Sequence, residues 1–222
     1  MFALQYGGPT LFFRDRLQDV RKKVATKGIH FDLNSATTTC SPYNSLDPDI
    51  EAALQGAMGV STLFNNDLHN RALDCLTFID IVISVFYRLL RFSILNEPPP
   101  ESAVHATYHI GLIVFMMTML ARRDRSQTIK CGLIFQRLRA VLENGSDKCD
   151  NKLVFWVTFM GGIWVANDDE GEWFATRVRA LAQQRGFDNW QTARSSLCEF
   201  PWINSLHDEP GRELWDRIAQ WH

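Results

Sequence analysis

The sequence lacks closely paired cysteines. Its cysteines are odd in number and widely spaced, and no two form a C-x-x-C pair: Cys40, Cys75, Cys131, Cys149 and Cys198. Such spacing supports neither a disulfide framework nor a structural zinc site. We therefore expect reduced thiols, as in an intracellular protein.

The chain also lacks a segment typical of a signal peptide or a membrane span. Residues 1–10 show no basic start followed by an apolar core. The longest apolar stretch, residues 76–95, is interrupted by Asp80, Arg88 and Arg91. We expect no membrane insertion and a cytoplasmic location, or a nuclear one if the protein regulates transcription.

Neither sign of charge is in clear excess. Lysine and arginine number 23 against 25 aspartate and glutamate residues, so the formal net charge is -2. The basic side chains between residues 14 and 27 are interrupted by Asp15 and Asp19. Because no continuous basic patch forms, we expect no nucleic-acid partner.

Familiar catalytic motifs are missing as well. The sequence has no Gly-rich phosphate loop, no G-x-S-x-G elbow, no H-E-x-x-H pair and no convincing nucleophilic triad. This argues against hydrolases, kinases, nicotinamide enzymes and metalloenzymes, so we expect no cofactor and no metal.

The chain is instead rich in aromatics, with 7 Trp and 15 Phe. Such residues fill a core or line an apolar pocket.

Helical periodicity dominates the chain, whereas strand signals are nearly absent. The expected helices cover residues 13–24, 48–56, 66–94, 100–122, 126–143, 151–165, 170–185, 189–198 and 210–220. Asp47, Asp188 and Asp208 are the expected N-caps of three of them. A long loop without periodicity is expected over residues 31–46.

These patterns predict an all-α fold, a single irregular bundle of about seven to nine helices. Residues 1–222 would form a single helical domain, with an N-terminal helix, a long loop and a short helix over 1–60 and the helical core over 61–222. Helices 100–122 and 151–165 are apolar nearly all round, so they should form a central pair. Helix 66–94 carries a polar stripe, and we expect its other faces to be buried. The stripe consists of Thr77, Asp80, Ser84, Arg88 and Arg91.

Several short segments of the C-terminal half follow an order known from one family. They are Pro100-Glu101, the run F-W-V-T-F-M-G-G-I over 155–163, Trp173-Phe174, G-F-D-N-W over 186–190, Phe200-Pro201-Trp202 and D-E-P-G-R-E-L-W over 208–215. Across residues 76–221 the chain resembles the C-terminal half of the regulatory domain of fungal binuclear zinc-cluster transcription factors. The resemblance implies an all-helical fold, a fungal source and a regulatory, effector-sensing module.

The sequence departs from that family at its N-terminal side. Members carry six closely spaced cysteines and a coiled-coil linker, and neither is found here. The front part of the regulatory domain is also missing. We therefore expect a truncated, stand-alone relative that lacks the DNA-binding part. A helical scaffold of this kind could have been recruited as a biosynthetic cyclase, which is an argument by analogy.

Two histidines mark the first candidate site. Glu101, His105 and His109 lie four residues apart, on one face of helix 100–122, and Tyr108 lies beside them. A His pair at this spacing can bind a metal, but no third ligand can be assigned. The open alternatives are a polar cluster in a pocket and an ordinary hydrogen-bonded first turn.

Gly161 and Gly162 mark the second candidate site. Each glycine inside a helix costs roughly 1 kcal/mol relative to alanine, so the pair should serve a purpose. Close approach of a neighbouring helix is one explanation. Space for a ligand between Trp156 and Trp164 is the other.

Two functions of different classes remain. The first is a cofactor-independent cyclase, pericyclic and of Diels–Alder type, which preorganises a hydrophobic fungal secondary metabolite in an apolar pocket. His105, Tyr108 and His109 would be the donors, and the pocket would be shaped by Tyr87, Met116, Trp156 and Trp164. The alternative is a non-enzymatic regulatory domain that binds a hydrophobic effector or dimerises through an apolar helical surface, as a homodimer.

Overall fold

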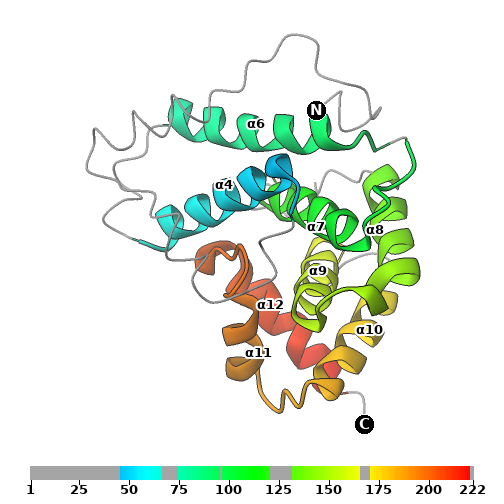
Figure 1. The fold of residues 1–222 in the computed structure, drawn as a ribbon. Coiled ribbons are helices and arrows are strands. Elements are labelled where there is room, and N and C mark those ends of the chain that lie inside the picture. Colours follow the sequence, from blue (N-terminus) through cyan, green and yellow to red (C-terminus); the bar gives the residue numbers. More distant parts are fainter. Residues whose placement is uncertain (1–45, 67–74, 96, 121–131, 166–170, 221–222) are drawn as a thin grey trace.

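The computed structural model describes residues 46–66, 75–95, 97–120, 132–165 and 171–220. Within these ranges the chain forms eight α-helices and one short 3-10 helix, and it forms no strand. The predicted all-α bundle of seven to nine helices is thus confirmed (Figure 1). The predicted helix at 13–24 and nearly all of the predicted loop at 31–46 lie outside the described residues.

The described elements occur along the chain in the following order. They are α4 (Pro48–Asn65), α6 (Cys75–Phe92), α7 (Ala103–Leu120), α8 (Gly132–Gly145), the 3-10 helix η3 (Ser146–Lys148), α9 (Asn151–Trp164), α10 (Gly171–Gln184), α11 (Trp190–Leu197) and α12 (Asn204–Ala219). Figure 1 shows α4 and α6 at one end of the molecule and α10, α11 and α12 at the other.

The apolar helices α7 and α9 form the predicted central pair. α7 packs against α4, α6, α8 and α9, and α9 packs against α7, α10, α11 and α12. Side chains of α9 lie directly against the backbone of α7 at Gly111, where an added Cβ would lie 2.6 Å from Val157 Cγ2 and 2.7 Å from Trp156. Burial of both helices on all sides explains why their sequences show so little polar periodicity.

Helix α4 is longer than predicted. Asp47 is its N-cap, as expected, and its Oδ1 accepts the N–H of Asp49 over 2.8 Å. The expected end at Gly56 is wrong, because the helix continues to Asn65. Its buried positions continue at helical spacing through Ala57 and Val60, and this tertiary packing outweighs the low helix propensity of glycine.

Helix α12 begins earlier than predicted, at Asn204 rather than Pro210. Asp208 is therefore not its N-cap; Ile203 holds that position, and the helix continues through Pro210. A similar, smaller shift occurs at α11, where Asn189 replaces the expected Asp188 and accepts the N–H of Thr192 over 3.0 Å.

The two glycines of α9 allow neighbouring helices to pack closely. A Cβ at Gly161 would lie 2.5 Å from Phe174 Cε1 in α10. One at Gly162 would lie 2.7 Å from Leu214 Cδ2 in α12. Close helix packing, one of the two explanations considered from the sequence, is thus observed, and side chains occupy the space beside both glycines.

The polar stripe predicted for helix 66–94 is only partly present in α6. Ser84 is fully buried rather than solvated. In addition, Leu76, Ile79 and Ile83 are exposed, so the expectation that all other faces are buried is wrong. Helix α6 packs against α4 and α7, and its buried residues include Ile81, Val85 and Leu89.

Candidate functional site

The two predicted histidine donors lie where the end of α6 meets the start of α7. The ring of Phe92 contacts both, with centroids 6.1 Å from His105 and 5.6 Å from His109. His109 is buried, and its Nε2 lies 2.8 Å from the carbonyl oxygen of Leu89. Because a carbonyl only accepts, Nε2 must carry the proton and donate it to this bond.

Burial governs the protonation of His109. Loss of hydration lowers its pKa to about 4, the bond to Leu89 opposes this shift, and the charge of Arg137 adds to it. The imidazole is therefore neutral near pH 7, and its one N–H is already used within the fold. This arrangement suits a structural contact between α6 and α7 better than general acid–base chemistry.

The other histidine connects α7 to the start of α4. His105 Nε2 accepts the backbone N–H of Asp47 over 3.2 Å. Asp47 in turn caps α4, and Asp49 in the first turn of α4 forms an ion pair with Arg91 of α6. His105 thus helps to hold the ends of three helices together.

The remaining predicted site residues lie on three helices, α6, α7 and α9. Tyr108 is buried in α7 and Tyr87 is half-buried in α6, whereas Trp164 lies two turns beyond Trp156 in α9. Met116 and Trp156 have 0% accessible surface, so they line no space that would admit even a water molecule. Their assignment to a substrate pocket stays a prediction, one that requires a different packing of the helices.

Trp156 makes a hydrogen bond and a stacking contact in the protein interior. Its Nε1 donates to the carbonyl of Pro201 over 3.2 Å, and its ring stacks on Phe200 with centroids 5.3 Å apart.

Among the described residues, no group of three or more His, Cys, Asp and Glu side chains is placed to hold a metal ion.

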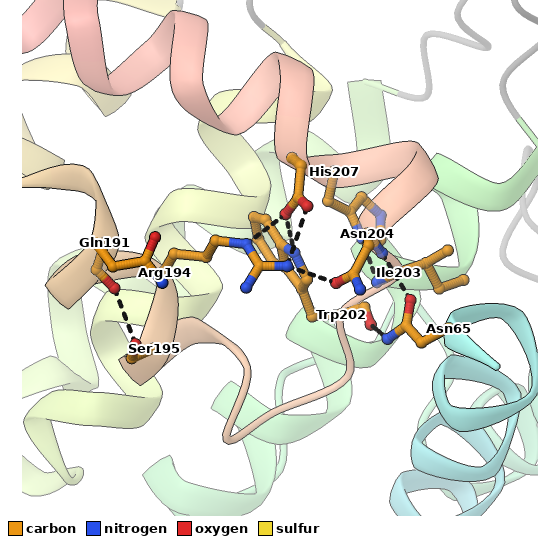
Figure 2. Close-up of polar contacts among 9 residues, drawn as sticks. Asn65, Gln191, Arg194, Ser195, Trp202, Ile203, Asn204 and His207 are labelled. Carbon is orange, nitrogen blue, oxygen red and sulfur yellow. Dashed lines mark hydrogen bonds and ion pairs between the residues drawn. The ribbon is translucent and has the colours of Figure 1, made fainter.

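A second polar cluster, which the sequence analysis missed, holds the connection between α11 and α12 (Figure 2). Asp208 Oδ1 accepts from Arg194 Nε over 2.8 Å and from Trp202 Nε1 over 2.9 Å. Asn65 of α4 donates to the carbonyl of Trp202 and accepts the N–H of Asn204, each over 2.8 Å. The cluster therefore ties α4, α11 and α12 together.

His207 completes this cluster on its buried side. Its Nδ1 accepts the N–H of Ile203 over 2.9 Å, so its proton is on Nε2, which lies 2.8 Å from Thr118 Oγ1. Burial lowers its pKa to about 3, although the charge of Asp208 opposes the shift. Both ring nitrogens are engaged, and the cluster is suited to stabilising the fold rather than to proton transfer.

A third feature is an open groove beside α9 and α10, with a volume of about 350 Å³. One wall carries Asp147, Asn151 and Val154, and the other belongs to α10. The α10 wall is formed by Arg177, Ala180, Leu181 and Gln184. Their spacing of three, four and seven residues places all four on one face of the helix.

The course of the two helices explains where the groove lies. Gly161 of α9 is in close contact with Phe174 in the first turn of α10, and an antiparallel register from that point brings Val154 level with Leu181. The helices are tightly packed at the glycine end and leave the groove at the other. Sequence signals for it were weak, since the α10 stripe mixes apolar and polar residues.

The groove has an apolar floor and charged edges. Val154, Ala180 and Leu181 supply the apolar surface, whereas Asp147 and Arg177 carry opposite charges. The guanidinium of Arg177 is held in place because it donates to the carbonyl of Leu142 and lies 5.5 Å from the ring centre of Trp173. Asn151 and Gln184 add amide groups that can both donate and accept.

Comparison of the chain with protein-family models, curated proteins and solved structures gives no match. The resemblance to the fungal regulatory domain accordingly stays a prediction. In the part of the chain that the structure describes, no helix is both long and apolar enough to cross a membrane.

Proposed function

We propose that this chain is a non-enzymatic, effector-binding regulatory domain, the second of the two functions considered from the sequence. The observation that supports it is the groove beside α9 and α10, whose volume of about 350 Å³ is within the usual range for small-molecule sites. Its lining residues offer charge, amide groups and apolar surface. They include no histidine, cysteine, serine or tyrosine, so the lining favours binding over catalysis.

The lining of the groove favours a more polar effector than the hydrophobic one expected from the sequence. Asp147 and Arg177 lie on its edges and can pair with an ammonium and a carboxylate group, respectively. The floor formed by Val154 and Leu181 can accept a short aliphatic body. A small zwitterion, such as an α-amino acid with an apolar side chain, combines these features.

The cyclase hypothesis has less support from the same geometry. His109 donates to Leu89 and His105 accepts from Asp47, so both histidines among the predicted donors already have partners within the fold. Met116 and Trp156 are inaccessible. A cyclase would need a rearrangement that separates the central helices.

Binding can be measured by NMR titration with a panel of the proteinogenic amino acids, with L-leucine as the first probe. N-acetyl-L-leucine lacks the ammonium charge and L-leucinamide lacks the carboxylate, so each should bind more weakly than L-leucine. Ala180→Trp should abolish binding by filling the groove. Ala140→Trp adds the same side chain to an exposed alanine of α8 and should leave binding intact.

Two outcomes would contradict the proposal. The first is that no amino acid of the panel shifts the resonances of groove residues at millimolar concentration. The second is that L-leucine binds equally well to the Ala180→Trp and Ala140→Trp variants. In that case the ligand occupies another surface.

A further inference from the structure

Two side-chain amides lie on opposite walls of the groove beside α9 and α10. Asn151 is the first residue of α9 and Gln184 is the last residue of α10, and both line the groove. The antiparallel register that brings Val154 level with Leu181 also brings Asn151 level with Gln184, because each is three residues from its neighbour on the same wall. Both walls therefore change from apolar to amide-bearing within one helical turn.

Neither amide is engaged within the part of the chain that the structure describes. Asn151 and Gln184 are exposed, and no hydrogen bond joins either side chain to another described residue. By contrast, Gln55 and Asn144 each donate to a residue four positions earlier in their own helix. The two groove amides thus keep their N–H donors and carbonyl acceptors for a ligand.

Arg177 lies at the other end of the same face of α10. It is seven residues before Gln184, which corresponds to about 10 Å along the helix. Its guanidinium lies 5.5 Å from the ring centre of Trp173, one turn closer to the start of α10. The guanidinium and the two amides are therefore separated along the groove, and the apolar surface of Val154 and Leu181 lies between them.

We propose that the effector is an α-amino acid whose aliphatic side chain ends in an uncharged carboxamide or urea group. This inference rests on the proposed function, which places the α-carboxylate at Arg177 and the aliphatic body on Val154 and Leu181. A side chain that continues along the groove brings its end between Asn151 and Gln184. A carboxamide both donates and accepts, as each of these amides does, whereas a carboxylate only accepts and an ammonium only donates.

The test is NMR titration of the full chain with L-glutamine, compared with L-leucine and L-glutamate. L-Glutamine should bind at least about threefold more tightly than L-leucine, since one added hydrogen bond improves an equilibrium constant by roughly two- to tenfold. L-Glutamate has nearly the same shape, but its second carboxylate cannot donate. It should therefore bind more weakly than L-glutamine.

A variant of Gln184 tests the role of the amide. Gln184→Met keeps the length of the side chain and removes its amide, so it should weaken the binding of L-glutamine about threefold without weakening that of L-leucine. Gln183→Met makes the same change at the neighbouring residue, which is exposed and does not line the groove. This control should retain the preference for L-glutamine, and circular dichroism checks that both variants remain folded.

The possible outcomes separate this inference from the proposed function. Equal affinities for L-glutamine and L-leucine would overturn the inference and leave the proposed function intact. A preference for L-glutamate or L-lysine would do the same, as would a preference for L-glutamine that Gln184→Met leaves unchanged. If no amino acid shifts the resonances of groove residues, the proposed function fails as well.

Discussion

The imidazole of His207 accepts a hydrogen bond from the backbone N–H of Ile203, four residues earlier, over 2.9 Å. Ile203 is the N-cap of α12 and makes no side-chain cap of its own. A side chain from inside the first turns thus satisfies the N–H at the start of the helix, as the returning half of a capping box does. This contact stabilises the start of α12 at residue 204.

Replacing His207 by alanine should therefore destabilise the protein. The change leaves the buried N–H of Ile203 without a partner, removes a bond to Thr118 and creates a cavity. We expect a loss of about 2 to 4 kcal/mol in the free energy of unfolding. His207→Asn keeps an acceptor near the position of Nδ1 and should lose less. Urea denaturation measures both, and equal losses would contradict the assigned role of the bond.

The free energy of unfolding should decrease as the pH is lowered within a defined range. Burial lowers the pKa of His109 to about 4 and that of His207 to about 3, below the value of about 6.5 expected for an unfolded chain. Between pH 6.5 and about 4 the unfolded state therefore binds more protons than the folded state. Each histidine should reduce the free energy of unfolding by up to roughly 1.4 kcal/mol per pH unit as the pH decreases there.

The control for this dependence is His207→Asn, which removes one of the two titrating groups. Urea denaturation at pH 7, 6, 5 and 4.5 should show a smaller decrease for this variant than for the parent chain. Carboxylates contribute to both proteins and largely cancel in the comparison. Parallel curves for the two proteins would contradict the neutral, buried state of His207.

Adding a methyl group at Gly161 should disturb the packing of α9 against α10. The new Cβ would lie 2.5 Å from Phe174 Cε1 and 2.9 Å from Leu138 Cδ2, and both side chains are buried and unable to move freely. Overpacking of this kind costs about 1 to 3 kcal/mol, which should exceed the helix-propensity gain of roughly 1 kcal/mol.

Gly132→Ala is the matched control, because a Cβ there meets nothing within 4 Å. Its free energy of unfolding should stay within about 0.5 kcal/mol of the parent value. Thermal unfolding followed by circular dichroism compares the two variants. A Gly161→Ala variant as stable as Gly132→Ala would show that the contact with Phe174 relaxes easily.

Asp208 should stabilise the fold more through the hydrogen bond that it accepts from Trp202 than through its ion pair with Arg194. The ion pair with Arg194 is partly exposed, with side chains 24% and 37% accessible, so Arg194→Ala should cost at most about 1 kcal/mol. Asp208→Ala also leaves the indole N–H of Trp202 without its acceptor and should cost about 1 to 3 kcal/mol. Asp208→Asn retains an acceptor and should lie between them. The reverse order in urea denaturation would refute this division.

Helix type and the central pair could be predicted from sequence because they depend on local periodicity. The apolar character of α7 and α9 and the paired glycines at 161 and 162 are visible without tertiary information. The end of α4 could not be predicted, because burial of Ala57 and Val60 against other helices overrides the signal from Gly56. The start of α12 depends on His207, a side chain that has no strong preference as a cap.

The candidate sites, like the helix ends, could be predicted only in part from the sequence. The spacing of His105 and His109 correctly placed both rings on one face of α7, where Phe92 contacts them. The spacing did not reveal that the His109 N–H is bonded to the carbonyl of Leu89. The groove was missed because its two walls lie on different helices, and their register is set by the contact between Gly161 and Phe174. No local pattern around Asp147 or Arg177 carries that information.

The most direct test of the account is to locate bound L-leucine by intermolecular nuclear Overhauser effects in the methyl-labelled protein. We predict contacts between the leucine methyl groups and the methyl groups of Val154 and Leu181, and their loss in the Ala180→Trp variant. Contacts instead with Met116 and Val157, beside Trp156 in the interior, would contradict the account. That result would show that the central helices open to admit a ligand, as the cyclase hypothesis requires.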